Sequence, residues 1–226
     1  MDLGLTGRVA LVVGGTGVVG TAVVDALRAE GATVVVASRH ASGEGSIAMD
    51  TRDAASVQAG VDAVLERHGA IHVLVNTAAP AAGTLDASRD RDPGQILDAV
   101  DGKAMGYLRC ANAVLPVMQA QGYGRVVNVS GQNGYLTGSV TGSVRNSAVM
   151  VISKNLADSL AGTGVTVNVV NPGRVTEEPS SEVRVGAGGE SSPVQVAALV
   201  AFLASEAAGA ISGESIAVGH RVRGVQ

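Results

Sequence analysis

The feature that most constrains the fold is an alternation that runs along the whole chain. Short runs of β-branched residues, beginning at 9–13, are followed by longer segments in which apolar residues recur with helical period. Strands separated by helices join in parallel through right-handed crossovers, which gives one sheet with helices on both faces. We therefore predict a single doubly wound α/β domain over residues 1–226, with a parallel sheet of about seven strands. The expected strands are 9–13, 33–37, 47–49, 73–76, 125–130, 166–171 and 215–218; the expected helices are 17–31, 54–68, 93–121, 145–161 and 193–204; the segments 131–143 and 176–192 are expected to be loops.

The composition agrees with this fold class. Hydrophobic residues make up 46% of the chain, and the mean hydropathy is +0.29, so there is enough apolar side chain for a large core. Aromatic residues make up only 2%, so the core must be built from Val, Ala, Leu and Ile. These residues suit parallel strands that are buried on both faces.

Charge, cysteine and hydropathy patterns exclude several functions. The formal net charge is −4 and no Lys/Arg cluster is present, so we expect no nucleic-acid partner. Cys110 is the single cysteine, which excludes an internal disulfide; we interpret it as a buried small residue and predict no metal site. The first residues lack the pattern of a signal peptide, and no apolar run approaches the roughly 18 residues that span a bilayer. We therefore expect no membrane association and a cytoplasmic location.

A glycine-rich turn follows the first strand and leads into a helix. Glycines in such a turn let the backbone approach a pyrophosphate, and the helix N-terminus presents free N–H groups to it. This position in a strand–turn–helix unit predicts a Rossmann-type dinucleotide site; the alternative is a plain strand-to-helix turn. The cofactor-binding residues expected there are Gly14, Thr16, Gly17, Val18 and Val19.

The end of the second strand bears on which dinucleotide is bound. An acidic residue there would accept a hydrogen bond from the ribose 2′-hydroxyl of NAD(H), whereas an arginine pairs with the 2′-phosphate of NADP(H). No acid occurs at 37–39, and the strand ends with Ser38 and Arg39. The sequence therefore favours NADP(H) over NAD(H), with a solvated loop arginine as the alternative for Arg39.

Four further segments resemble motifs of a known family of dinucleotide-binding enzymes. They are Asp50-Thr51, Leu74-Val75-Asn76-Thr77-Ala78-Ala79, Gly124-Arg125-Val126-Val127-Asn128-Val129-Ser130 and Val167-Asn168-Val169-Val170-Asn171-Pro172-Gly173. Together with the glycine-rich turn they make the chain resemble the classical short-chain dehydrogenases/reductases over nearly its whole length. The resemblance implies an oxidoreductase with a nicotinamide cofactor. It adds further cofactor contacts at Asp50, Thr51, Asn76, Ala78, Pro172 and Gly173.

The catalytic positions depart from the family, whose chemistry rests on an Asn, a Ser, a Tyr and a Lys four residues after the Tyr. Keeping the register of the downstream match assigns Gly142 to the tyrosine, Asn146 to the lysine and Lys103 to the asparagine. The serine position holds Gly131, with Ser130 just before it. The candidate catalytic residues are therefore Ser130, Asn146 and Lys103, although a helix lysine such as Lys103 is also explained by a side chain that reaches solvent.

Three other side chains are weighed for the missing chemistry. Tyr135 lies in the 131–143 loop, where its hydroxyl is an alternative proton donor; an ordinary loop aromatic is the simpler interpretation. His220 follows the last strand and is interpreted as a surface residue first and a catalytic group second. Lys154 has Met150 four residues before it, so we interpret it as a solvated helix residue.

Three functions stay open on the sequence alone. The first is an NADP(H)-dependent oxidoreductase acting on a small carbonyl or hydroxyl compound through an atypical active site. The second is a non-catalytic subunit that forms a hetero-oligomer with an active relative, and the third is a non-redox enzyme that reuses the pocket. Apolar positions in helices 93–121 and 145–161, including Leu115, Val149 and Leu160, predict a homodimer or homotetramer assembled through these helices.

Overall fold

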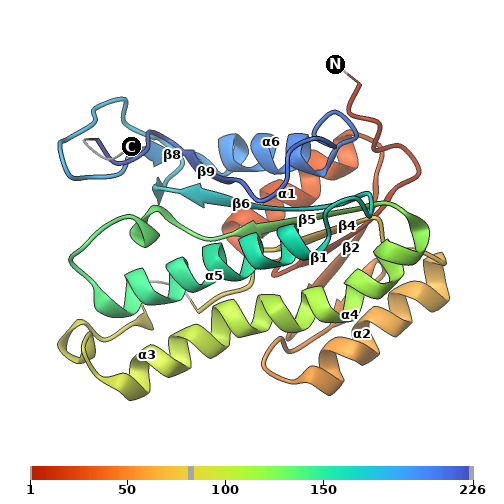
Figure 1. Ribbon diagram of the computed structural model, residues 1–226, viewed down its shortest axis with the longest axis horizontal. Helices are drawn as coiled ribbons and strands as arrows, with labels where there is room; N and C mark the ends of the chain where they lie inside the picture. Colours follow the sequence, from red (N-terminus) through yellow and green to blue (C-terminus); the bar gives the residue numbers. More distant parts are fainter. Residues whose placement is uncertain (1, 81–83, 224–226) are drawn as a thin grey trace.

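The computed structural model describes residues 2–80 and 84–223, and it confirms the doubly wound α/β fold (Figure 1). Its main sheet has seven strands, all paired in parallel, in the order β3-β2-β1-β4-β5-β6-β9. The strands of this sheet are β1 (Val9–Val13), β2 (Thr33–Ser38), β3 (Ser46–Ala48), β4 (Val73–Asn76), β5 (Gly124–Val129), β6 (Val165–Pro172) and β9 (Ser215–Val218).

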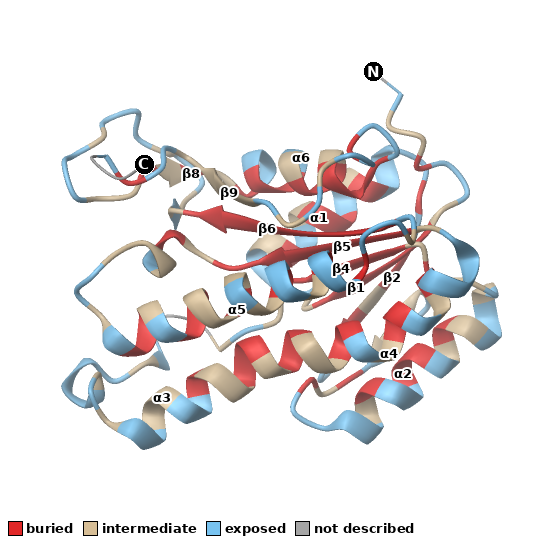
Figure 2. Cartoon of the chain, in the orientation of Figure 1, coloured by how far each residue is buried: buried red, intermediate tan, exposed pale blue. Residues whose placement is uncertain are grey.

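Helices cover both faces of this sheet. One face packs against α1 (Val18–Ala29) and α6 (Pro193–Ala204). The other packs against α2 (Ala54–His68), α4 (Gly106–Gln121) and α5 (Val140–Ser159). The central strands are almost wholly buried, whereas the helices expose their outer faces (Figure 2). Within the described residues, no helix is both long and apolar enough to cross a membrane.

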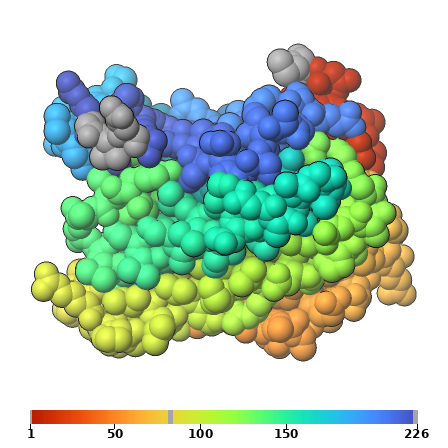
Figure 3. Space-filling view, viewed as in Figure 1, coloured from red at the N-terminus to blue at the C-terminus, as the bar shows by residue number. Residues whose placement is uncertain are grey.

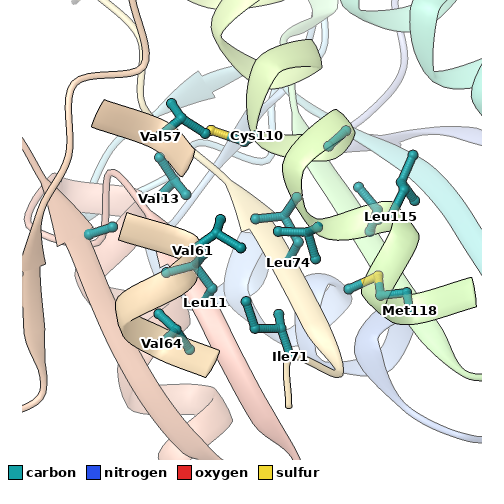
Figure 4. Packing of buried hydrophobic residues seen from close by; sticks show 14 of the residues in the cluster. Leu11, Val13, Val57, Val61, Val64, Ile71, Leu74, Cys110, Leu115 and Met118 are labelled. Carbon is teal, nitrogen blue, oxygen red and sulfur yellow. The ribbon is translucent and has the colours of Figure 1, made fainter. Parts of the chain in front are cut away.

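The larger core cluster shows why these segments fold as they do. Leu11, Val13 and Leu74 project from β1 and β4 toward residues of α2 and α4 (Figure 4). The contacting residues of α2 recur at helical spacing, and each fully buried aliphatic side chain contributes about 1.5–3 kcal/mol. Burial raises the pKa of the Cys110 thiol to about 12, so this cysteine behaves as a small apolar residue, as the sequence analysis interprets it. The side chains that line this layer from the helices are Val57, Val61, Val64, Cys110, Leu115 and Met118.

Two elements differ from the sequence-based prediction. Helix α5 begins at Val140, five residues before the predicted start, because residues from a distant segment cap it. The predicted helix 93–121 is formed by α3 (Pro93–Val100) and α4 joined by a π-helical turn, Asp101–Met105. The segment after β6 is also less irregular than expected, since β7 (Arg174–Val175) pairs with β8 (Glu190–Ser191).

Candidate active site

The glycine-rich turn lies where the strand order reverses, between β1 and β4. Gly14 has a φ of +84°, and a Cβ there would lie 2.4 Å from the backbone nitrogen of Ala78, at the end of β4. Gly17 is the N-cap of α1, and no side chain caps this helix. The turn therefore leaves the first N–H groups of α1 without side-chain acceptors, which fits a diphosphate at a switch point of a doubly wound sheet.

The residues expected at the adenosine end differ in how open they are. Arg39 is exposed and forms no ion pair or hydrogen bond with any described residue. Ser38, the residue before it, is half-buried. The Asp50 carboxylate accepts a hydrogen bond from the backbone N–H of Arg52 at 3.0 Å and so caps its own turn. Thr51 is buried beneath the π-helical turn, where a Cβ on Gly106 would lie 2.9 Å from its Oγ1. Of these residues, Ser38 and Arg39 are the ones free to contact a ligand phosphate.

The asparagine at the end of β4 has a structural role. Asn76 is fully buried, and its Nδ2 donates to Asn128 Oδ1 at 2.8 Å. The Nδ2 of Asn128 in turn donates to the Ser153 hydroxyl oxygen at 2.9 Å. This chain of hydrogen bonds joins β4, β5 and α5, and it directs the Asn76 side chain into the protein.

Strand β6 ends at Pro172, and the backbone of Gly189 passes close to the next residue, Gly173. Pro172 is buried, and the Gly173 N–H donates to the Val218 carbonyl at 3.1 Å. A Cβ at Gly173 would lie 1.8 Å from the carbonyl oxygen of Gly189, so only glycine fits there.

The three candidate catalytic residues meet in one hydrogen-bonded cluster. Lys103 Nζ donates to Asn146 Oδ1 at 2.8 Å and to the backbone carbonyl of Ser130 at 2.9 Å. The Ser130 hydroxyl donates to the backbone carbonyl of Asn146 at 3.0 Å. Because an ammonium group only donates, its contact fixes the Asn146 amide with the oxygen toward Lys103. Side chains from three separate elements therefore converge at the carboxyl end of β5.

Lys103 is a buried cation. It lies in the π-helical turn, and its side chain is 4% exposed. Burial, with a smaller contribution from the nearby Arg145 charge, lowers the pKa of Lys103 to about 7. The group therefore exchanges its proton near neutral pH instead of remaining an ammonium throughout the physiological range.

The register predicted from the sequence assigns Lys103 to the family's asparagine position and Asn146 to its lysine position. In the structure, the hydrogen bond between them joins the π-helical turn to α5. At the serine position, a Cβ on Gly131 would point toward the Asn146 amide, 3.4 Å from Nδ2. Gly142, at the tyrosine position, lines a cavity instead of supplying a hydroxyl.

The other weighed side chains lie apart from this cluster. The Tyr135 hydroxyl is held by Ser215, whose backbone carbonyl it contacts at 3.2 Å. Tyr107 donates to the Val129 carbonyl at 3.0 Å, and burial raises the pKa of its hydroxyl far above the usual range. His220 is exposed, and Lys154 is exposed and paired with Asp158, which agrees with its interpretation as a solvated helix residue. None of the chain's three tyrosines, all of which lie in the described residues, donates into the Lys103 cluster.

The cavity beside Gly142 brings in two residues that sequence reasoning missed. It has a volume of about 520 Å³ and lies between residues 85–91 and the start of α5. Arg145 was missed although it shares the helix face of Gly142, three residues away, which is a usable sequence signal. Asp90 had no such signal, since the helix end that it caps lies about fifty residues further along. The charged and polar residues of the lining are Asp86, Ser88, Asp90, Arg91, Asn133, Ser139 and Arg145.

Comparisons with known proteins agree with this architecture. The family model for short chain dehydrogenase matches residues 8–185. A putative ketoacyl reductase of the monensin polyketide synthase from Streptomyces virginiae is 32% identical, over 94% of this chain and 96% of the relative. The (2S)-[(R)-hydroxy(phenyl)methyl]succinyl-CoA dehydrogenase subunit BbsC of Thauera aromatica is 34% identical, over 94% and 93%.

The similarity extends to a reductase and to a solved structure. The 3-oxoacyl-[acyl-carrier-protein] reductase FabG of Escherichia coli is 28% identical, over 94% of this chain and 96% of the relative. The crystal structure of gox2181 superposes with a TM-score of 0.81 at 27% identity, covering 96% of each chain. From these matches and from its fold, the chain belongs to the short-chain dehydrogenase/reductase family.

Proposed function

We propose that this protein is an NADP(H)-dependent oxidoreductase that acts on a small carbonyl or hydroxyl compound, with Lys103 in place of the missing Tyr/Lys pair. The observation that carries the proposal is the buried hydrogen-bonded cluster of Lys103, Asn146 and Ser130 at the carboxyl end of β5. The names of the relatives, among them a putative ketoacyl reductase and a 3-oxoacyl reductase, support the class of reaction.

The cofactor would lie across the turn after β1. The uncapped N-terminus of α1 and the close packing of Gly14 on Ala78 support a diphosphate there, and the exposed Arg39 supports a 2′-phosphate at the end of β2. When bound, the nicotinamide would supply or accept the hydride. In this proposal Asp50, Thr51, Asn76, Pro172 and Gly173 shape the walls of the site through the contacts described above.

The chain's own contribution is to hold a proton near the reacting atoms. Asn146 Oδ1 and the Ser130 carbonyl orient the Lys103 ammonium, and burial keeps its pKa near 7. The ammonium form would supply the proton that carbonyl reduction consumes, and the neutral amine would take up the proton that alcohol oxidation releases. Because Lys103 is enclosed, we expect the transfer to be slower than through an open tyrosine hydroxyl, whose acid/base role is typically worth about 10²- to 10⁴-fold.

The test is single-turnover NADPH oxidation with a panel of ketones, measured from pH 5 to 9 on the natural protein and on Lys103→Gln. We expect slow reduction whose rate falls as the pH rises through about 7, and a variant that is at least tenfold slower with no inflection there. Lys154→Gln, which alters an exposed lysine on α5, is the matched control and should keep the natural profile. An unchanged rate and profile in Lys103→Gln would remove Lys103 from the reaction.

A second candidate is a non-catalytic subunit that pairs with an active relative. It is favoured by the Thauera aromatica relative, which is named as a dehydrogenase subunit, and by the exposed apolar side chains Leu97 and Val151 on α3 and α5. This candidate predicts no NADPH oxidation by the protein alone at any pH, and activity that appears only on mixing with a partner of the same family.

A further inference from the structure

Two buried cations, Lys103 and Arg145, lie near each other, and no carboxylate among the described residues pairs with either of them. Arg145 is 6% exposed and Lys103 is 4% exposed, and neither forms a salt bridge with any described residue. Desolvation disfavours the charged form of both side chains and lowers their pKa values. The Arg145 charge also disfavours the Lys103 ammonium. Buried charges in proteins are normally paired, because an isolated charge loses its hydration on burial without compensation.

Arg145 has unused hydrogen-bonding capacity beside the cavity. Its one hydrogen bond within the described chain runs from Nη1 to the Pro80 carbonyl at 3.1 Å. The buried Nε has no acceptor among the described residues. The residue lines the cavity that opens where Gly142 replaces the tyrosine of the family pattern. Nη2 also forms no hydrogen bond with any described residue, and a carboxylate oxygen is the acceptor that makes a charge-assisted hydrogen bond with such a donor.

The acids that line the same cavity are occupied by other donors. The Asp90 carboxylate accepts hydrogen bonds from the Ser139 hydroxyl and from the backbone N–H groups of Val140 and Thr141. The Asp86 carboxylate accepts from the backbone N–H and the hydroxyl of Ser88. Arg145 is therefore a buried charged group in the lining that has no counter-ion among the residues that the structure describes.

We propose that the cavity beside Gly142 binds the carboxylate of a small organic acid, with the Arg145 guanidinium as its partner. The binding itself does not depend on a redox reaction. Its extension, that the substrate is an oxo acid or hydroxy acid held by its carboxylate, rests on the proposed function. A cavity of about 520 Å³ has room for such a molecule beyond its carboxylate.

Calorimetric titration with 4-oxopentanoate and 7-oxooctanoate, each compared with its methyl ester, tests the binding without turnover. Each acid and its ester share the carbonyl and differ in the negative charge. We expect the acids to bind at least tenfold more tightly than the esters, as for a charge-assisted pair that is worth about 1.5–3 kcal/mol. Equal affinity of acid and ester, or no binding of either acid, overturns the proposal on the natural chain alone.

Substitutions at Arg145 then test whether this residue is the one that binds the carboxylate. Arg145→Gln should abolish the preference for the acid, and Arg145→Lys should keep part of it. Arg91→Gln, which alters an exposed arginine in the same lining, is the matched control and should change the preference less than threefold. A preference that survives in Arg145→Gln assigns it elsewhere and contradicts the proposal. Failure of the oxidoreductase proposal would leave the acid/ester ratio unchanged, so the two outcomes are distinguishable.

Discussion

At the scale of single residues, this site is defined by where its charges stand. The predicted register assigns Lys103 and Asn146 to exchanged positions of the family pattern, and in the structure the Lys103 ammonium is enclosed by Ser130 and Asn146. Desolvation favours the neutral amine, whereas the hydrogen bonds favour the ammonium. Desolvation outweighs them, since the pKa of Lys103 falls to about 7.

The first prediction concerns stability and pH. The pKa of Lys103 is lower in the folded state than in the unfolded chain, so the unfolded state binds more protons between about pH 7 and 10. The free energy of unfolding of the natural protein should therefore rise with pH across this window, relative to Lys103→Met, by up to about 1.4 kcal/mol per pH unit. Below pH 7 the difference should be constant, with the Met variant the more stable.

Urea unfolding at pH 6, 7, 8 and 9 measures this difference. Lys154→Met provides the control, because its lysine is exposed and ion-paired on the surface of α5. Unfolding curves for Lys103→Met that run parallel to those of the natural protein at every pH would show that Lys103 titrates near its ordinary value.

The second prediction concerns the choice of cofactor. Arg39 is exposed and has no partner in the described chain, so its charge is available to a 2′-phosphate. We expect tighter binding of NADPH than of NADH, and we expect Arg39→Ala to reduce that preference about tenfold to a hundredfold. Titration calorimetry checks it, with the exposed Arg67 on α2 changed to alanine as the control. Stronger binding of NADH by the natural protein would contradict the prediction.

At the scale of elements, the start of α5 depends on a residue far away in sequence. The Ser139 hydroxyl caps the helix by accepting from the Gly142 N–H at 3.0 Å. The Asp90 carboxylate accepts from the backbone N–H groups of Val140 and Thr141. These hydrogen bonds lower the pKa of Asp90. They also hold Gly142 and Arg145 beside residues 85–91, so the cap builds one wall of the cavity.

The third prediction follows from this cap. Asp90→Ala should lower the urea midpoint and speed amide hydrogen exchange at residues 140–144, because three donors lose their acceptor. The natural protein should lose the same stabilisation as the pH falls through the lowered pKa of Asp90, and the variant should not. Asp86→Ala is the control, since its carboxylate caps only the short turn at Ser88. Unchanged exchange at 140–144 in Asp90→Ala would show that the cap is not needed.

At the scale of the whole molecule, α5 and α3 lie side by side on one face, which Figure 3 shows in space-filling form. The side chains expected at an oligomer interface, on the predicted helices 93–121 and 145–161, include Leu115, Val149 and Leu160. All three are buried in the protein's own core, so that part of the expectation was wrong. The exposed apolar side chains of this face are instead Leu97, Val140, Val144 and Val151.

The fourth prediction places the homo-oligomer contact on this face. Val151 is 61% exposed at the middle of α5, and Leu97 is 69% exposed on α3. We expect the protein to be a dimer or tetramer in light scattering and Val151→Glu to shift it to the mass of one chain, 22.4 kDa. Val194→Glu, on α6 at the other face of the sheet, matches the substitution at a similar exposure of 71% and should leave the mass unchanged. A natural protein that already has the mass of one chain would contradict the prediction.

The class of fold and most of the elements could be predicted from local patterns in the sequence. Strands β1, β4 and β9 and helices α2 and α6 have the predicted bounds, because their apolar periodicity and their caps are local properties of the chain. The glycine-rich turn could also be predicted, since Gly14 must take a positive φ directly after a buried strand. The register to the family pattern was sufficient to name Lys103, Ser130 and Asn146 together.

The contacts among those residues could not be predicted in this way, because they form between distant segments of the chain. The Lys103 to Asn146 hydrogen bond joins residues 43 apart, and the Asp90 cap joins residues about fifty apart, so no local pattern encodes either contact. Burial depends on which elements cover a side chain. Burial lowers the pKa of Lys103, and it encloses the Arg145 Nε where no described residue accepts its hydrogen bond. A linear sequence lists the charged groups, but their solvation and their partners arise when distant segments pack together.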